Sequence, residues 1–302
     1  MIRAVRGHQF EIVPNVSEGR DAAVIDACVA AMQAAGVRVV HRTSDPAHHR
    51  SVITAVGAAS QVVAAALELA RVAHERIDLR AHRGAHPRIG ALDVLPFVPL
   101  GDATIDDAVV LAHRAAARIW RELGIPSYLY GAAATAPHRR HLGDVRRGEF
   151  EALGARSLAD PAWRFDYGDA AHATAGAIAV GARPFLIAFN VELASGDLRL
   201  ARRIAATLRA SGGGLRTLKC LGLRLDDHRV QVSCNVTDAD AVPLYRITEL
   251  VRRAAARARV RVARSELIAL APRDAVVRTA RAYDARANFA RGGTEPQEDD
   301  VP

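Results

Sequence analysis

The sequence predicts an α/β protein of the α+β kind, with two ferredoxin-like β-α-β-β-α-β subdomains whose sheets face a central cleft. Two observations predict this fold. The same order of strand and helix patterns occurs twice, and each helical pattern is amphipathic, so its apolar stripe can cover a sheet. The 302 residues, 50% of them hydrophobic, are enough for two cores. We expect subdomains at 1–182 and 183–284, and a disordered tail at 285–302, which is rich in Gly, Glu, Asp and Pro.

The first repeat combines short β-branched runs with two helical patterns. Val24, Cys28 and Met32 follow helical spacing and predict the first helix, which Gly36 ends. Runs of β-branched residues predict the strands. The expected elements are a strand at 10–14, a helix at 20–35, strands at 37–40 and 51–56, a helix around 62–70 and a strand at 92–100.

The second repeat has the same order of patterns. Its expected elements are a strand at 185–192, a helix at 197–210, strands at 218–225 and 230–236, a helix at 243–258 and a strand at 260–267. Between the repeats, Thr104 and Asp107 stand in capping-box spacing and begin a helix at 104–123. Residues 131–176 predict a long functional loop around a basic helical stretch at 139–147.

The composition excludes several classes of protein. The formal charge is +8, but Lys219 is the only lysine and the arginines are spread along the chain, so we expect no nucleic-acid partner. No run approaches the roughly 20 apolar residues that span a bilayer. Residues 1–19 have no signal-peptide pattern, which predicts a cytoplasmic protein without a membrane partner. Cys28, Cys220 and Cys234 lack metal-binding spacing and are expected to be reduced core thiols.

Residues 82–93 hold the strongest functional pattern: two histidines, two arginines and two glycines where a helical pattern gives way to a strand. An imidazole with an ordinary pKa of about 6.5 can accept and donate a proton near neutral pH. Pro87 restricts the backbone beside His86 and so gives the ring a defined direction. If the segment stays helical, His82 lies on the same face as His86, as an orienting or ligand-binding group.

Many motifs, in order from about Phe10 to Tyr283, resemble glutamate formimidoyltransferase. Examples are Val-Pro-Asn-Val-Ser-Glu-Gly-Arg at 13–20 and His-Pro-Arg at 86–88. Further motifs lie at 44–46, 50–52, 84–93, 96–97, 128–130, 147–151, 180–190, 211–214 and 231–235. Because so many motifs occur in register, the resemblance is more specific than a single short fingerprint.

The resemblance implies a usually homodimeric enzyme of histidine degradation. Such an enzyme transfers the formimino group of N-formimino-L-glutamate to N5 of tetrahydrofolate, giving 5-formiminotetrahydrofolate and L-glutamate. Its partners would be formiminoglutamate and polyglutamylated folate, with tetrahydrofolate as co-substrate and no metal. The chain is expected to lack the cyclodeaminase domain that is fused to this one in some relatives.

The resemblance places the catalytic histidine at His86. Arg88 and Arg50 lie inside family motifs and are expected to bind carboxylates through bidentate hydrogen bonds. Arg183 is a further candidate, which could equally form an ion pair at the domain junction. Other expected substrate or folate contacts are His82, Asn15, Ser17, Asn190, Gly168 and Gly176. Gly168 and Gly176 bound a loop that aligns with a folate-contacting loop of the family, and Asn15, Ser17 and Asn190 could equally serve as caps or in turns.

Three positions depart from the family pattern. Ala85, His49 and His41 stand where relatives have Glu, Asn and Asp. The missing carboxylate at 85 removes a partner that would raise the pKa of His86. The departures leave open a folate-binding relative that uses a different one-carbon donor or has no transferase activity.

Two further alternatives come from the residues themselves. Ferredoxin-like sheets can bind RNA through exposed aromatic residues, but the predicted strands supply few. Several histidines with an acidic neighbour could hold zinc, although their spacing is not that of HExxH. The candidate zinc ligands are His41, His48, His49, His82, His86 and Asp45.

Overall fold

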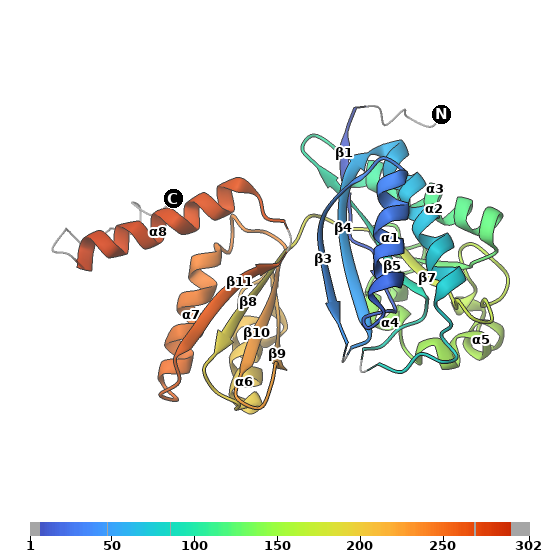
Figure 1. Ribbon diagram of the computed structural model, residues 1–302. Helices are drawn as coiled ribbons and strands as arrows, with labels where there is room; N and C mark the ends of the chain where they lie inside the picture. Colours follow the sequence, from blue (N-terminus) through green and yellow to red (C-terminus); the bar gives the residue numbers. More distant parts are fainter. Residues whose placement is uncertain (1–6, 47, 85, 269, 291–302) are drawn as a thin grey trace. The chain divides into compact units, whose positions relative to one another are not determined.

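A computed structural model describes residues 7–46, 48–84, 86–268 and 270–290, and the chain forms two compact units, Met1–Phe185 and Leu186–Pro302 (Figure 1). Each unit contains one sheet with helices, so the predicted α+β class is confirmed. The division falls three residues after the predicted boundary at 182. Arg183 still belongs to the first unit because its N–H donates a hydrogen bond to the carbonyl of Phe97.

The first unit is built on a seven-stranded sheet. Its strands are β1 (Gln9–Ile12), β2 (Asn15–Val16), β3 (Arg38–Asp45), β4 (Arg50–Ala58), β5 (Leu92–Leu100), β6 (Ser127–Gly131) and β7 (Ile178–Ala182). In space β3 pairs with β4, β4 with β1 and β2, and these with β5, and all of these pairs are antiparallel. This strand order is that of a ferredoxin-like unit, as predicted.

Strands β6 and β7 extend this sheet and were not predicted. β7 pairs in parallel with β5, and β6 pairs in parallel with β7. Both strands have five residues, Ser-Tyr-Leu-Tyr-Gly and Ile-Ala-Val-Gly-Ala. Because they contain alanine and glycine and few β-branched residues, the sequence pattern gave only a weak strand signal.

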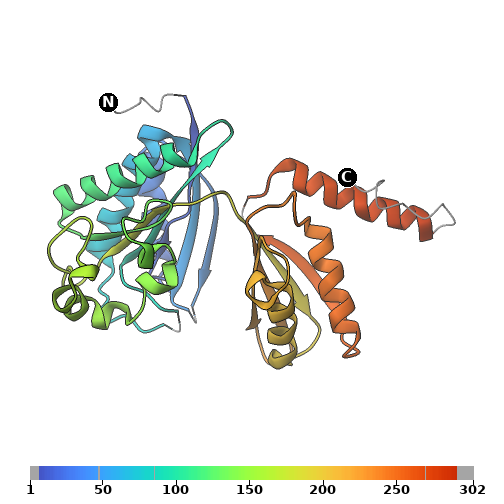
Figure 2. The same ribbon diagram turned by 180° about the vertical axis from the view of Figure 1, so that it is seen from behind.

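Helices α1 (Ala22–Ala34), α2 (Ala59–Arg76) and α3 (Ile105–Leu123) cover one face of the sheet (Figures 1 and 2). The predicted capping box of α3 is confirmed, because the Thr104 side chain accepts a hydrogen bond from the N–H of Asp107. The predicted basic stretch forms the 3-10 turn η1 (Pro137–Arg139) and the short helix α4 (Leu142–Val145). It is followed by α5 (Glu149–Ala159) and the 3-10 turn η2 (Pro161–Trp163).

Alternate residues of the central strands enter two different cores. Leu95 and Leu129 pack with the three long helices, whereas Val94 and Tyr128 join a smaller cluster with Val145 of α4. Neighbouring residues of a strand point to opposite faces of the sheet. Helices therefore cover both faces of the sheet in the part formed by β5, β7 and β6.

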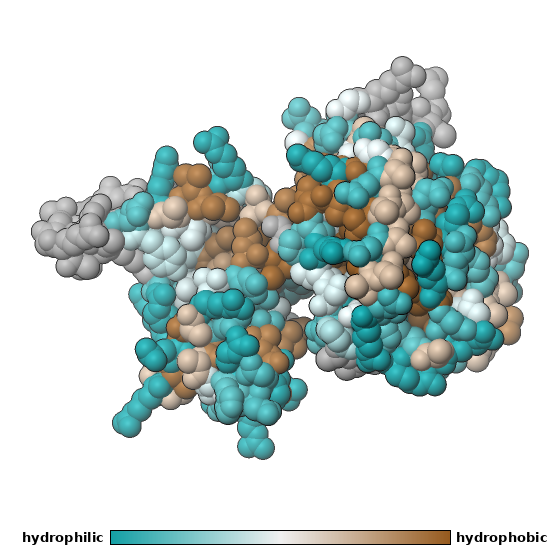
Figure 3. Space-filling view, viewed as in Figure 1, coloured by the Kyte–Doolittle hydropathy of each residue, from teal (hydrophilic) through white to brown (hydrophobic). Residues whose placement is uncertain are grey.

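The second unit is a four-stranded antiparallel sheet in the order β11-β8-β10-β9, which is again ferredoxin-like. Its elements are β8 (Ile187–Leu193), α6 (Leu198–Leu208), η3 (Ala210–Gly212), β9 (Leu218–Arg224), β10 (Val230–Val236), α7 (Leu244–Ala256), β11 (Val262–Ile268) and α8 (Arg273–Ala290). Hydrophobic residues reach the surface along α8 and the adjoining end of β11 (Figure 3). Helix α8 extends to Ala290, six residues into the tail predicted at 285–302. Residues 291–302 lie outside the described residues.

The three cysteines are free and buried, as predicted. Cys220 and Cys234 face each other across β9 and β10, with their Sγ atoms 2.8 Å apart. Within the described part of the chain, no helix is both long and apolar enough to cross a membrane.

Candidate active site

Asp93 is the centre of the site in the first unit. It is fully buried near the start of β5, among apolar residues of that strand. Its Oδ2 accepts hydrogen bonds from Arg50 Nη1 at 2.7 Å and Arg146 Nη2 at 2.5 Å, and its Oδ1 accepts one from the N–H of Ile89 at 2.8 Å. Burial alone would raise the pKa of Asp93, but Arg146 and Arg50 outweigh burial and hold this pKa below its ordinary value. Asp93 is therefore a carboxylate that fixes two guanidinium groups.

Arg50 also binds Asn15. Its Nε and Nη2 donate to Asn15 Oδ1 at 2.9 and 2.6 Å, and Asn15 Nδ2 donates to the carbonyl of Val13. The register places Asn15 of β2 between Val52 of β4 and Val94 of β5. The structure thus brings the predicted residues Asn15 and Arg50 together, and most of the guanidinium of Arg50 is used within the protein.

His86 lies directly beside this cluster. Its Nδ1 is 2.8 Å from the carbonyl of Pro87 and 3.3 Å from Arg50 Nη1. Because the carbonyl contact is shorter, we place the proton on Nδ1, donating to Pro87, and this leaves the lone pair on Nε2. Burial, together with the positive charges of Arg50 and Arg146, lowers the pKa of His86 to about 4. The expectation of an ordinary pKa was therefore wrong, and the resting ring is neutral.

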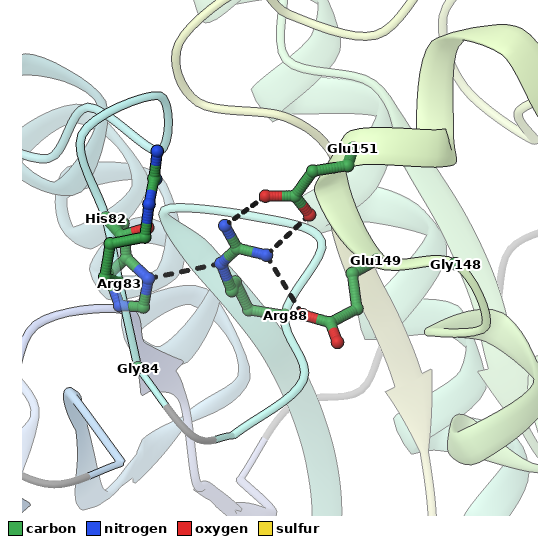
Figure 4. A pocket seen from close by; sticks show the side chains of 7 residues that line it. All are labelled: His82, Arg83, Gly84, Arg88, Gly148, Glu149 and Glu151. Carbon is green, nitrogen blue, oxygen red and sulfur yellow. Dashed lines mark hydrogen bonds and ion pairs between the residues drawn. The ribbon is translucent and has the colours of Figure 1, made fainter.

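Arg88 is buried and its guanidinium is fully engaged within the protein (Figure 4). Nε donates to His82 Nδ1 at 3.2 Å, while Nη1 and Nη2 donate to Glu151 at 2.8 and 2.7 Å. Nη1 also donates to Glu149 at 3.0 Å, and the hydrogen bond from Arg88 lowers the pKa of Glu151 to about 2. These residues line a cavity of about 420 Å³. Because the guanidinium of Arg88 already donates hydrogen bonds to two glutamates, it does not offer a free pair of N–H donors for the expected bidentate contact with a substrate carboxylate.

His82 does not share a helical face with His86, because α2 ends at Arg76 and the chain from 82 to 84 is irregular. Its Nε2 donates to the carbonyl of His49 at 2.9 Å, and its Nδ1 accepts from Arg88. Burial lowers the pKa of His82, in keeping with a neutral ring. Both ring nitrogens are used, so His82 supports Arg88 and is not free to bind a ligand.

The turn between β3 and β4 explains one departure from the family pattern. His49 has a φ of 51°, in the left-handed region that Asn and His tolerate better than most residues. Its ring stacks on His82 with centroids 4.3 Å apart, and its Nδ1 accepts from the N–H of Gly19. Gly84 passes so close that a Cβ there would lie 2.4 Å from the carbonyl of His48. His49 can thus replace Asn for reasons of local packing, while Ala85 lies outside the described residues.

Of three other predicted residues, Ser17 and Gly176 contact the backbone of residues 89–90, whereas Gly168 lies apart from it. The buried hydroxyl of Ser17 donates to the carbonyl of Gly90. Gly176, with a φ of 69°, would place a Cβ 2.0 Å from the carbonyl of Ile89, so only glycine fits there. Gly168 instead packs against Trp120 and Pro126. Of the two glycines that bound this loop, only Gly176 therefore contacts the segment that carries the site.

Arg183 and Asn190 lie in different units. Arg183 follows β7 and donates to the carbonyl of Pro184, and its burial lowers its pKa. Asn190 is on β8, opposite Ser233 of β10 and Glu266 of β11. Its Oδ1 is enclosed and has no hydrogen-bond partner among the described residues.

The histidines do not converge on a metal. His48 pairs with Asp45 at 2.5 Å, whereas His49 stacks on His82 and His86 faces Pro87 and Arg50. Among the described residues, no group of three or more His, Cys, Asp or Glu side chains is arranged to hold a metal ion.

Four residues of this network were missed by sequence analysis: Asp93, Arg146, Glu149 and Glu151. Asp93 carried a usable signal, since it is the single charge inside the apolar run Leu92–Leu100, and buried charges are normally paired. Its partner Arg146 lies 53 residues away, in the region with the least regular pattern. Only the fold brings that arginine to β5.

Comparison with known proteins identifies the class. Residues 9–183 match the N-terminal subdomain of the formiminotransferase domain, and residues 188–294 match the formiminotransferase domain. The chain belongs to the formiminotransferase family. It is 45% identical to a glutamate formimidoyltransferase from Streptococcus pyogenes, over 90% of this chain and 92% of that protein. A glutamate formimidoyltransferase from Thermoplasma acidophilum is 41% identical, over 90% of this chain and 91% of that protein. A formimidoyltransferase-cyclodeaminase from Gallus gallus is 39% identical, over 90% of this chain and 52% of that protein.

Asp93→Asn should destabilise the first unit by about 3 to 5 kcal/mol, because Arg50 and Arg146 would keep buried charges without their carboxylate. Chemical denaturation followed by tryptophan fluorescence measures this, since Trp120 and Trp163 both lie in the first unit. Asp102→Asn, at an exposed turn, is the control with the same change in charge. Equal losses for the two variants would contradict the role of Asp93.

Arg88→Ala should lower stability by about 1.5 to 3 kcal/mol, the range for charge-assisted hydrogen bonds. Glu151→Gln removes the acceptor of the same interaction. If Arg88 acts through Glu151, the double variant should lose less than the two single variants combined, by about 0.5 kcal/mol or more in a double-mutant cycle. Strictly additive losses in the denaturation assay would show that the pair does not interact.

Proposed function

We propose that this chain is a glutamate formimidoyltransferase, which transfers the formimino group of N-formimino-L-glutamate to N5 of tetrahydrofolate. The single observation that carries the proposal is the position of His86, whose Nδ1 lies 3.3 Å from Arg50 Nη1, in a member of the formiminotransferase family. A neutral imidazole can accept a proton from an amine, and the adjacent cations attract an anionic donor. The products are 5-formiminotetrahydrofolate and L-glutamate.

The reaction needs two proton transfers: N5 must lose a proton, and the nitrogen of the departing glutamate must gain one. N5 attacks the carbon of the protonated formimino group, the electron pair of its C=N bond moves to the imino nitrogen, and the N5 proton moves to Nε2 of His86, which gives a neutral tetrahedral intermediate and an imidazolium. The imidazolium then returns this proton to the glutamate nitrogen as the carbon–nitrogen bond to glutamate breaks. Because burial and the charges of Arg50 and Arg146 lower the pKa of His86 to about 4, its imidazolium is a stronger acid than an ordinary imidazolium and favours departure of glutamate.

Two of the arginines form hydrogen bonds within the protein, and a third is assigned to the substrate. Arg88 is held by Glu149 and Glu151, and Arg50 by Asn15 and Asp93. Arg146 contributes Nη2 to Asp93. We assign the carboxylate of the donor to the remaining terminal nitrogen of Arg146, which replaces Arg88 in the role expected from the sequence. Four expectations stay predictions: folate contacts by Arg183 and Asn190, a cleft between the subdomains, a homodimer and a cytoplasmic location.

His86→Ala should lower turnover of formiminoglutamate with tetrahydrofolate by about two to four orders of magnitude, because the acid and base group is lost. The absorbance of the folate product measures turnover, and the melting temperature should stay close to that of the unmodified chain. His228→Ala, at an exposed turn of the second unit, is the control and should retain activity. Near-normal turnover of His86→Ala would remove His86 from the mechanism, and absence of turnover by the unmodified chain would refute the proposed function.

A further inference from the structure

A tight turn at the end of the loop from Gly168 to Gly176 carries a histidine that the proposed mechanism does not use. His172 and Gly176 pair across the turn, because the N–H of each donates to the carbonyl of the other, at 2.9 and 3.0 Å. The ring of His172 bends back over the turn, and its Nδ1 accepts hydrogen bonds from the N–H groups of Thr174 at 3.3 Å and Ala175 at 3.1 Å. One side-chain atom thus satisfies two backbone N–H groups, as in an Asx turn.

These contacts define the protonation state of His172. Nδ1 can accept hydrogen bonds only when it carries no proton, so we place the proton of the neutral ring on Nε2. The hydroxyl of Thr174, 3.4 Å from Nδ1, can donate to the same atom. Burial of the ring, followed by the charge of His74 on α2, lowers the pKa of His172, and the centroids of the two rings lie 4.6 Å apart. Protonation would turn an N–H toward two other N–H groups, so the neutral ring is the form that fits the turn.

The peptide group between Thr174 and Ala175 links the ring of His172 to the site. A peptide group is planar and trans, so its N–H and its carbonyl point in opposite directions. The N–H of this group binds Nδ1 of His172, and its carbonyl accepts a hydrogen bond from the N–H of Leu79 at 2.9 Å. The imidazole therefore orients the carbonyl that holds Leu79.

The peptide group that follows Ala175 is fixed in the same way, by the backbone of His172. Its N–H binds the carbonyl of His172, and its carbonyl accepts a hydrogen bond from the N–H of Ala91 at 3.0 Å. Leu79 and Ala91 lie on either side of the stretch of sequence that carries His86. Two consecutive carbonyls of one turn thus hold both ends of this stretch.

The second end of this stretch continues into the centre of the site. The carbonyl of Ile89 accepts a hydrogen bond at 2.9 Å from the N–H of Ala177, the residue that follows the turn. The N–H of Ile89 donates to Asp93 at 2.8 Å. Asp93 in turn holds Arg50, whose Nη1 lies 3.3 Å from Nδ1 of His86. The position of His86 relative to Arg50 therefore depends on backbone that the turn holds in place.

We propose that His172 is a positioning residue for the transfer reaction, because its imidazole orders the turn that holds both ends of the stretch carrying His86. The inference rests on the proposed function, since that function assigns the proton transfers to His86. Catalytic groups must be held close to their productive geometry, so loss of this support lowers turnover. The role requires an acceptor at the position of Nδ1, which the side-chain oxygen of an asparagine also provides.

His172→Ala should lower the turnover number by about 10- to 100-fold, the effect of displacing a catalytic group by about 1 Å. The KM for formiminoglutamate should change by less than about threefold, since Arg146, to which its carboxylate is assigned, lies outside the stretch. His172→Asn keeps an acceptor and should restore the turnover number to within about threefold of that of the unmodified chain. His141→Ala, which changes an exposed histidine of the same unit, is the control. Equal losses in the two His172 variants, or full turnover of His172→Ala, would overturn the proposal.

NMR measurements test the same role without turnover. In the unmodified chain at neutral pH, spectra of the ring nitrogens of His172 should show Nδ1 without a proton and Nε2 with one. The amide protons of Leu79 and Ala91 should exchange with solvent about 10-fold faster in His172→Ala than in His172→Asn, because the carbonyls that bind them lose their orientation. A proton on Nδ1, or equal exchange in the two variants, would overturn the proposal. Neither result depends on the reaction, so these measurements separate failure of this role of His172 from failure of the proposed transferase activity.

Discussion

The ion pairs of Asp93 with Arg50 and Arg146 are the constraint on which the rest of the site depends. A fully buried carboxylate is tolerated only when it is paired and hydrogen-bonded. Here the partners come from β4 and from the end of α4, so one side chain of β5 joins three distant parts of the sequence. Burial of the His86 ring and the charges of the same two guanidinium groups lower the pKa of His86 and favour its neutral form.

A second network fixes the segment that carries His86. Arg88 links His82 to Glu149 and Glu151, and His82 in turn holds the carbonyl of His49. The residues around His86 are thus tied to the β3–β4 turn on one side and to α5 on the other. Residues whose chemistry first suggested ligand binding serve here to position the histidine, which is a common division of labour around catalytic groups.

The repeat of strand and helix patterns was sufficient to predict both ferredoxin-like units, because their apolar spacing is local. β6 and β7 escaped prediction because β6 has no β-branched residue, while β7 has only Ile178 and Val180 among alanine and glycine. The motifs point to His86, and the structure brings Asn15 and Arg50, both expected substrate contacts, together beside it. The partners of Asp93 and Arg88, and the shift in the pKa of His86, could not be predicted, because they depend mostly on contacts between residues 36 to 63 positions apart.

The central claim is that His86 is neutral at rest because burial of its ring, together with the charges of Arg50 and Arg146 that Asp93 holds in place, opposes its protonation. NMR titration of the His86 imidazole in the full chain tests this most directly. The ring should take up a proton only near pH 4, since burial and the two cations disfavour the charged form. A midpoint at or above the ordinary value of about 6.5 would contradict the account.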